Sequence, residues 1–121
     1  MLEIGQKQSE TFPGTEEVGT AKINAERLGD TLKTGQISPP AMLKLDVQGF
    51  EKQALSGCED LLQGFSYIYV ESSFVELYKG QALAPEVIDW PHSHGLTLIG
   101  VHNIFYDPTG RAIQGDFLFA A

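Results

Sequence analysis

The sequence lacks the features that mark secreted, membrane-spanning and disulfide-stabilised proteins. Its single cysteine, Cys58, cannot form a disulfide within the chain, and this scarcity suits a reducing compartment. No apolar run reaches the length of about 18 residues that a membrane-spanning helix requires. The first residues contain neither a basic segment nor the apolar core of a signal peptide. Together these absences predict a cytoplasmic protein that does not bind a membrane.

Positive charge is also scarce, because 8 Lys and Arg residues are set against 16 Asp and Glu residues and the net charge is −8. The basic residues are scattered, so most of the surface would repel a nucleic-acid backbone. Also missing are a Ser–His–Asp order, a zinc-ligand spacing and a phosphate-binding loop. We expect no nucleic-acid partner, and nothing in the pattern indicates a metal site. The composition is otherwise that of one globular domain.

The first part of the chain is polar and rich in turn-forming residues. We expect residues 1–22 to form a flexible arm, whereas residues 23–121 carry the apolar patterns of a folded domain. Three minor elements precede the first clear strand: a short strand over 18–23, a brief helix over 25–32 and an extended linker over 35–40. The linker contains Pro39 and Pro40, which exclude a helix there.

A strand–helix–strand unit is predicted next. Alternating apolar residues indicate a strand over 42–48. An apolar stripe that includes Leu55 and Cys58 indicates a helix over 51–63, and a second apolar run indicates a strand over 67–72. Two strands joined by a helix of this length should be parallel, with a right-handed crossover.

The second half of the chain predicts one more helix and a hairpin. Pro85 suits the start of a helix, because its missing N–H costs nothing there, and Pro91 should kink or end that helix. A strand is predicted over 96–102. Residues 107–110 have Asp first, Pro second and Gly fourth, which is typical of a tight turn. A strand over 112–120 should therefore return antiparallel to the one before it.

Polar side chains follow the first strand of the strand–helix–strand unit. Asp46 and Gln48 are two apart in the predicted strand and so should point to the same side. Gly49 lets the backbone turn, and Glu51 lies in the first helical turn, where the helix dipole favours a carboxylate. Two acids and an amide could hold a ribose, an amine or a metal ion, or act as a general base. Ligands of open α/β sheets bind at such strand ends.

Each of these acids also has a purely structural explanation. Glu51 would then be an ordinary helix-start acid and Asp46 a turn residue. Glu71 ends the second strand of the unit and would face the same crevice if the strands are in register, or else is a solvated strand-end acid. His92 and His94 are placed poorly for joint metal ligation and suit a helix end. The residues alone leave both interpretations of the acids open.

The same residues resemble a known family of enzymes. The run from Leu43 to Glu51, followed by the helix segment 54–62, is similar to the C-terminal half of FkbM-type methyltransferases, which depend on S-adenosylmethionine. The resemblance covers roughly residues 23–120. Weaker matches follow in the expected order: Tyr69-Val70-Glu71, Leu77 to Gln81, Glu86-Val87-Ile88, His94-Gly95-Leu96 and Gly115 to Phe119.

The resemblance implies a fold and a set of site residues. The fold is α/β, a partial Rossmann-like methyltransferase fold: a four-stranded mixed sheet of three parallel strands and one antiparallel strand, with two main helices. The last strand would insert between the second and third. Asp46, Gln48, Glu51 and Glu71 would be catalytic, and Asp46 and Gln48 would also contact S-adenosylmethionine. The methyl acceptor implied is a small molecule, often with a reacting hydroxyl.

Two parts of the family pattern are missing from the 121 residues, namely a glycine-rich loop after a first strand and an acid after a second. We therefore expect a C-terminal half-domain that is inactive alone. The bare edge of strand 42–48 should pair with a second copy or be covered by the N-terminal arm. Two other functions stay open: a non-catalytic α/β module that binds a ligand or partner, and a metal-dependent enzyme that uses Asp46, Gln48 and Glu51.

Overall fold

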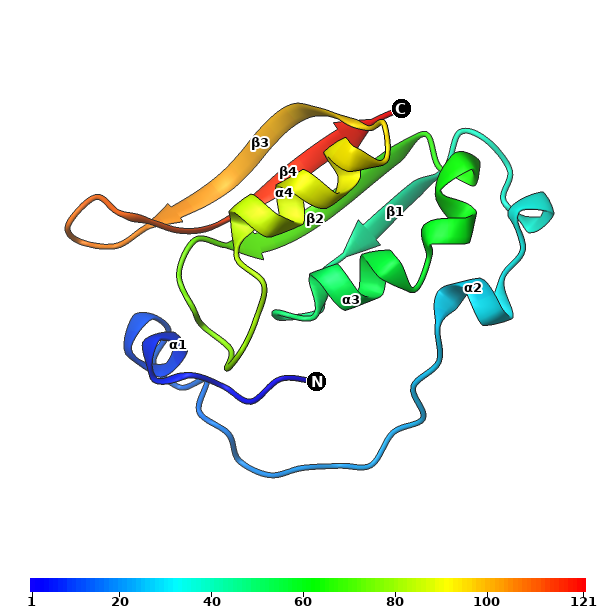
Figure 1. Cartoon of the computed structure of the whole chain (residues 1–121). Coiled ribbons are helices and arrows are strands. Elements are labelled where there is room, and N and C mark those ends of the chain that lie inside the picture. Colours follow the sequence, from blue (N-terminus) through cyan, green and yellow to red (C-terminus); the bar gives the residue numbers. More distant parts are fainter.

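A four-stranded mixed sheet organises the chain. The computed structural model describes all 121 residues. The strands lie in the order β1-β2-β4-β3 (Figure 1). Their bounds are β1 (Met42–Leu45), β2 (Tyr67–Ser73), β3 (Thr97–Tyr106) and β4 (Ala112–Ala120). The helical elements are α1 (Gln6–Thr11), α2 (Leu28–Thr31), the 3-10 helix η1 (Thr34–Gln36), α3 (Glu51–Ser56), the 3-10 helix η2 (Glu59–Gly64) and α4 (Ala84–Ser93).

The strand pairing corrects one expectation and confirms another. β1 and β2 pair in parallel, as the strand–helix–strand unit predicts. β4 lies between β2 and β3 and pairs antiparallel with both, which agrees with the antiparallel return and the insertion that we expected. The expected set of three parallel strands is therefore reduced to one parallel pair, because β4 separates β3 from β2.

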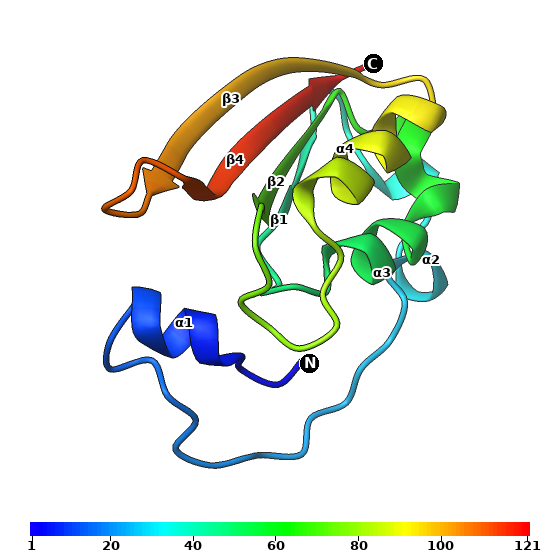
Figure 2. The same ribbon diagram turned by 60° about the vertical axis from the view of Figure 1, so that its left-hand side comes forward.

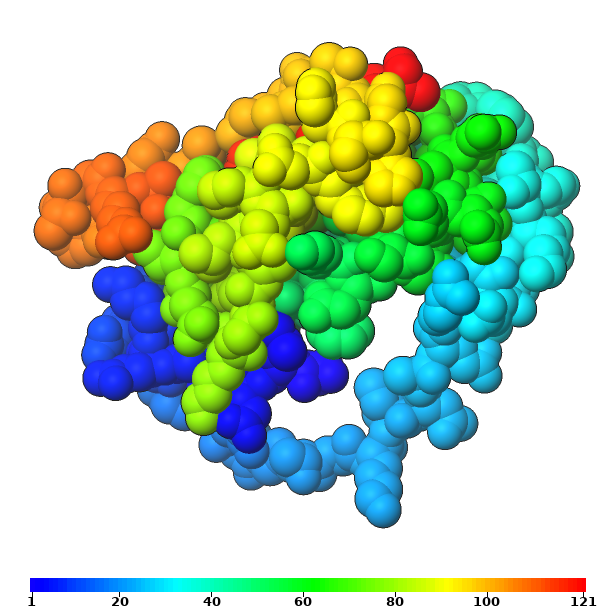
Figure 3. Space-filling model, viewed as in Figure 1, coloured from blue at the N-terminus to red at the C-terminus, as the bar shows by residue number.

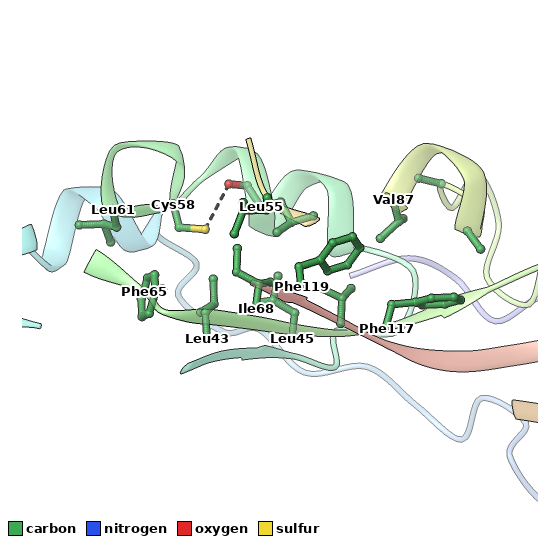
Figure 4. Close-up of a cluster of buried hydrophobic side chains, with 14 residues drawn as sticks. Leu43, Leu45, Leu55, Cys58, Leu61, Phe65, Ile68, Val87, Phe117 and Phe119 are labelled. Carbon is green, nitrogen blue, oxygen red and sulfur yellow. Dashed lines mark hydrogen bonds between the residues drawn. The ribbon is translucent and has the colours of Figure 1, made fainter. Parts of the chain in front are cut away.

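The core lies between the sheet and the helices α3, η2 and α4, all on one face (Figure 2). Ile68 and Val70 of β2 are fully buried, and Phe117 and Phe119 of β4 lie beside them (Figure 4). The same cluster includes Leu43 and Leu45 from β1 and Leu55, Leu61 and Val87 from the helices. Each such side chain contributes about 1.5–3 kcal/mol when it leaves water. This packing fixes the ends of β1 and β2 relative to each other.

The helix predicted over 51–63 is divided in two. α3 ends at Ser56, and η2 begins at Glu59 with the tighter 3-10 geometry. The apolar stripe stays buried although the helix is divided, since Leu55, Cys58 and Leu61 are all buried. Their spacing of three matches the three-residue turn of a 3-10 helix. The thiol of Cys58 donates to the Leu55 carbonyl at 3.2 Å, so this cysteine is part of the core.

The other predicted elements agree with the structure to differing degrees. α4 includes Pro91, which is buried, and ends two residues after it at Ser93. β3 continues four residues beyond its predicted end, from His102 to Tyr106. The tight turn forms, since the Gly110 amide donates to the Asp107 carbonyl at 2.9 Å. None of the helices is long and apolar enough to cross a membrane.

The first part of the chain contains a helix that its sequence does not indicate. α1 follows Gly5, whose amide donates to the Leu77 carbonyl at 2.7 Å, and Ile4 forms a bridge with Tyr78. The rings of Phe12 and Phe105 are 4.9 Å apart. Residues 13–27 contain no helix or strand, are exposed throughout and arc away from the sheet (Figure 3). The strand expected over 18–23 is therefore wrong, and the expected helix is confined to α2.

Candidate functional site

The face of the sheet opposite to α3, η2 and α4 is open over β1 and the start of β2. We call it the open face. Met42 and Tyr67 are directly opposite each other in the pairing of β1 with β2 and are 56% and 40% exposed. Strand alternation then brings Lys44 and Tyr69 to the same face. Polar residues at this end of the sheet are therefore accessible from the side without helices.

A row of polar residues crosses the open face at the carboxyl ends of β1 and β2. Leu45 pairs with Val70, so the next residues, Asp46 and Glu71, lie level with each other. Glu71 is directly opposite Asp116 on β4, which is in turn opposite His102 on β3. Asp46 and Glu71 are thus adjacent, as we expected from two parallel strands in register. We call Asp46, Glu71, Asp116 and His102 the polar row.

The carboxyl groups of Asp46 and Glu71 act on each other. Burial raises the pKa of Glu71, and a hydrogen bond with Asp46 and the negative charges of Asp46, Asp116 and Glu51 raise it further, to about 8. Negative charge around a half-buried carboxyl group disfavours its ionised form, so Glu71 keeps its proton to a higher pH than an ordinary glutamate. The pair can therefore accept or release a proton at the pH of a cell.

The turn after Asp46 has an unusual backbone. β1 ends at Leu45, three residues before the predicted end of the strand. Gln48 and Gly49 both have positive φ, at 51° and 98°, and the Phe50 amide donates to the Val47 carbonyl at 3.3 Å. These angles resemble those of a type I′ turn. Gln48 therefore lies in a tight turn, and the strand alternation used in the prediction does not set its direction.

Glu51 is the most buried of the four predicted site residues, at 2% exposure. Its Oε1 accepts the Gly49 amide at 3.1 Å, whereas its Oε2 is buried without a hydrogen-bond partner. Burial raises the pKa of the Glu51 carboxyl, against the effect of the backbone amides around it. This side chain holds the turn closed through Oε1, while its Oε2 is enclosed by the protein without a partner.

Tyr78, in the connection between β2 and α4, adjoins this turn. A Cβ atom at Gly49 would lie 3.1 Å from the Tyr78 Cβ and 2.9 Å from the Gln81 Cβ. Burial raises the pKa of the Tyr78 phenol, and the charges of the three nearby acids, Glu71, Asp46 and Glu51, raise it further. Tyr78 therefore lies close to the acid cluster, although the sequence patterns did not single it out as a site residue.

His94, the C-cap residue of α4, contacts residues outside the acid cluster. His94 Nε2 lies 2.9 Å from Glu59 Oε1, and the His94 ring stacks on Trp90 at 4.0 Å. The hydrogen bond to Glu59 raises the pKa of His94. No group of three or more His, Cys, Asp or Glu side chains is arranged to hold a metal ion. The metal-dependent alternative thus gains no support from the geometry.

A groove borders β1 on the side of the helices. It has a volume of about 600 Å³, and its lining includes Leu28, Leu43 and Phe50. None of the four predicted site residues lines it. The acids lie at the sheet end and the groove beside the strand, so they are separate features of the surface.

A comparison with protein families gives one match. The methyltransferase FkbM domain matches residues 2–97. The chain belongs to the FkbM methyltransferase family. Comparisons with curated proteins and with solved structures give no match.

The matched part of the FkbM domain differs from the range of the resemblance. It begins at residue 2 rather than about residue 23, so the first segment with α1 lies within the family match. All four predicted site residues, Asp46, Gln48, Glu51 and Glu71, lie inside it. The match ends at residue 97, where β3 begins. His102, Asn103 and Asp116 therefore lie outside the matched part.

β3 and β4, which follow the matched residues, add a hydrogen-bonded group to the open face. Asp116 Oδ2 accepts the Tyr69 hydroxyl at 2.9 Å and the Asn103 amide at 2.8 Å. The His102 ring is stacked 6.3 Å from the Tyr69 ring. Sequence reasoning missed Tyr69 and Asp116. Their polar positions in otherwise apolar strands are the only local signal, since the pairing of β2 with β4 brings them together.

Proposed function

We propose that the chain carries the catalytic edge of an S-adenosylmethionine-dependent O-methyltransferase that acts on a small molecule with a reacting hydroxyl. The observation that supports this most is the level position of Asp46 and Glu71 on adjacent strands, with the pKa of Glu71 raised to about 8, in a member of the FkbM methyltransferase family. Methyl transfer to a hydroxyl releases a proton, and this pair can take it near neutral pH.

The chemistry of the acid cluster fits one end of S-adenosylmethionine. That molecule supplies an activated methyl group on a positively charged sulfur. The charges of Asp46, Glu71 and Glu51 act on one another, and a cation nearby would relieve this repulsion. Asp46 and Gln48 would hold the donor's charged end, because they lie at the carboxyl end of β1, where ligands of such sheets bind.

Each residue then has a distinct role in the proposed reaction. As the acceptor oxygen takes the methyl group, its proton passes to the Asp46–Glu71 pair, with Glu71 as the group that keeps it. Glu51 holds the turn at Gly49 and so fixes the position of Asp46 and Gln48. Because the pKa of Glu71 is about 8, the ionised fraction of the pair, and with it the rate, should rise as the pH approaches that value.

The 121 residues contain no glycine-rich donor-binding loop. We therefore propose that this polypeptide binds S-adenosylmethionine only weakly without further protein to hold the adenosine. Titration calorimetry tests this, and a dissociation constant in the micromolar range would contradict it.

Amide NMR spectra recorded during the same titration test where the donor's charged end lies. We expect the largest changes at Asp46, Gln48 and Gly49. S-adenosylhomocysteine, whose sulfur is neutral, should produce smaller changes. Asp46→Asn should reduce the difference between the two ligands, whereas Asp89→Asn, on the exposed side of α4, should not. Equal responses to both ligands in the unaltered chain would refute the donor-facing role.

A non-catalytic binding module is the second candidate. The exposed apolar side chains of Met42 and Tyr67 on the open face favour it, because such residues at a strand edge suit contact with another chain. Glu71→Gln separates the two functions. A binding module should keep its partner with this substitution, whereas a methyltransferase should lose the pH dependence of its rate.

A further inference from the structure

The carboxylate of Asp116 is held by two donors on the open face. Its Oδ2 accepts the hydroxyl of Tyr69 at 2.9 Å and the side-chain amide of Asn103 at 2.8 Å. Two hydrogen bonds to one carboxylate oxygen fix its position. Asp116 is thus a negative charge with little freedom to turn away from its neighbours.

The backbone of Asn103 departs from an ordinary strand to make this contact. Its φ is 52°, a value that few residues other than glycine adopt. The pairing of β3 with β4 is irregular between His102 and Phe105, the interval that contains Asn103. Unfavourable backbone geometry of this kind is common where a side chain has a specific task. Here it places an amide donor on Asp116.

Asp116 stands directly opposite Glu71 in the antiparallel pairing of β2 with β4. Two like charges at such a position are unfavourable, because opposite side chains lie only about 5 Å apart. The negative charge of Asp116 therefore raises the pKa of Glu71, which binds its proton more tightly than an ordinary glutamate. Glu71 is therefore the neighbour that keeps a proton, beside the carboxyl group of Asp46.

We propose that Asp116 is a positioning residue of the methyl-transfer site that acts through Glu71, because its fixed negative charge keeps the proton of the Asp46–Glu71 pair on Glu71. This inference rests on the proposed function, which gives that proton its use. It adds to the family assignment, because Asp116 and Asn103 lie beyond the matched residues 2–97. The pKa of Glu71, raised to about 8 with Asp116 among its causes, agrees with this role.

Other ionisable groups also face Glu71, and their pKa values have to be followed in the NMR experiment described below. They come from each neighbouring element: Asp46 after β1, Lys44 on β1, Glu51 at the start of α3, Tyr69 on β2, Tyr78 in the β2–α4 connection, and His102 on β3. Only Asp116 is both directly opposite Glu71 and held by two donors.

Carbon-13 NMR of the Asp and Glu carboxyl groups tests the proposal without donor or acceptor. The higher of the two pKa values of the Asp46–Glu71 pair should fall in Asp116→Asn. One charge removed from a half-buried site at roughly 6 Å predicts a fall of about 0.5–2 pH units. Asp89→Asn removes the same charge from the exposed side of α4 and should leave that pKa unchanged. An unchanged pKa in Asp116→Asn, or an equal fall in both variants, would overturn the proposal.

A second variant keeps the charge of Asp116 and removes only the Asn103 amide that donates to it. Asn103→Gly suits the left-handed backbone at this position and therefore should not disturb folding. It should lower the same pKa in the same direction as Asp116→Asn but by less, because Asp116 gains freedom to turn away. If Asp116→Asn does not fold, an unchanged pKa in Asn103→Gly overturns the proposal. The readout is independent of methyl transfer, so the proposed function can fail while this arrangement stands.

Discussion

Replacing Gly49 by alanine should destabilise the protein through contacts that surround one turn. A Cβ atom at this position would lie 2.9 Å from the Gln81 Cβ, 3.1 Å from the Tyr78 Cβ and 3.0 Å from Leu2 Cδ1. Leu2 Cδ1 is the end of a flexible side chain and can move. The two Cβ atoms are attached directly to the backbone, so the β2–α4 connection itself would have to shift.

The loss of stability caused by Gly49→Ala has two parts. Gly49 has a φ of 98°, and placing a Cβ in a left-handed conformation costs roughly 1–2 kcal/mol. Inserting a methyl group into a filled space costs a further 1–3 kcal/mol or so. We therefore expect Gly49→Ala to lower the free energy of unfolding by about 2–5 kcal/mol, a large share of the roughly 5–15 kcal/mol of a typical domain.

A matched glycine separates the two parts. Gly95 also has a positive φ, of 83°, but a Cβ atom there would meet nothing within 4 Å. Gly95→Ala should therefore show the backbone cost alone, about 1–2 kcal/mol. Urea unfolding followed by circular dichroism measures both variants. Equal losses in the two would refute the packing argument. Adding Leu2→Ala to Gly49→Ala should restore only part of the stability, since it relieves the flexible contact and leaves the other two.

Three further predictions concern β1 and the acid pair. Leu45→Lys should destabilise the fold by about 3–5 kcal/mol in urea unfolding, because it places an unpaired charge on the buried side of β1, where Leu45 is 9% exposed. Thermal unfolding should show stability falling as the pH rises from about 4.5 to about 8, because Glu71 binds its proton more tightly in the folded chain than its ordinary value of 4.5. We also propose that the outer edge of β1 pairs with a second copy, so sedimentation should show a dimer that strengthens with protein concentration and with salt.

Each of these predictions has its own control. Lys44→Leu changes the neighbouring exposed position and should cost far less than Leu45→Lys. Glu71→Gln should flatten the pH dependence of stability, and an unchanged slope would assign that slope to other groups. A monomer at all concentrations would contradict pairing through β1. The first segment of the chain does not cover that edge, because its backbone contact is with Tyr78.

The sequence predicted the strand–helix–strand unit because its pattern is local. Apolar alternation located β1 and β2, and an apolar stripe at a spacing of three stayed buried even where α3 gives way to η2. The neighbouring positions of Asp46 and Glu71 followed from parallel strands in register. The turn at 107–110 was likewise predictable, because Asp, Pro and Gly each suit one position of it.

The features that the sequence did not predict depend on contacts between residues that are far apart in the chain. α1 has no apolar period, and it is held by the bond from Gly5 to Leu77 and by the contact of Phe12 with Phe105. The role of Asp116 could not be inferred from its neighbours in the sequence, because it depends on which strand lies beside β2. The periodicity of the sequence indicates which residues lie on each face of a strand, but it does not indicate which strands pair with each other.

The position of β4 has a consequence for how the protein is made. β4 follows all the other elements in the sequence, yet it lies inside the sheet between β2 and β3. While the chain emerges from the ribosome, β1, α3 and β2 can associate early, but β3 has no strand to join until β4 is complete. The Glu71 carboxyl then meets Asp116 last of all. The arrangement of Asp46, Glu71 and Asp116 is therefore one of the final products of folding, and a nascent chain halted before residue 112 should hold the first two acids without Asp116.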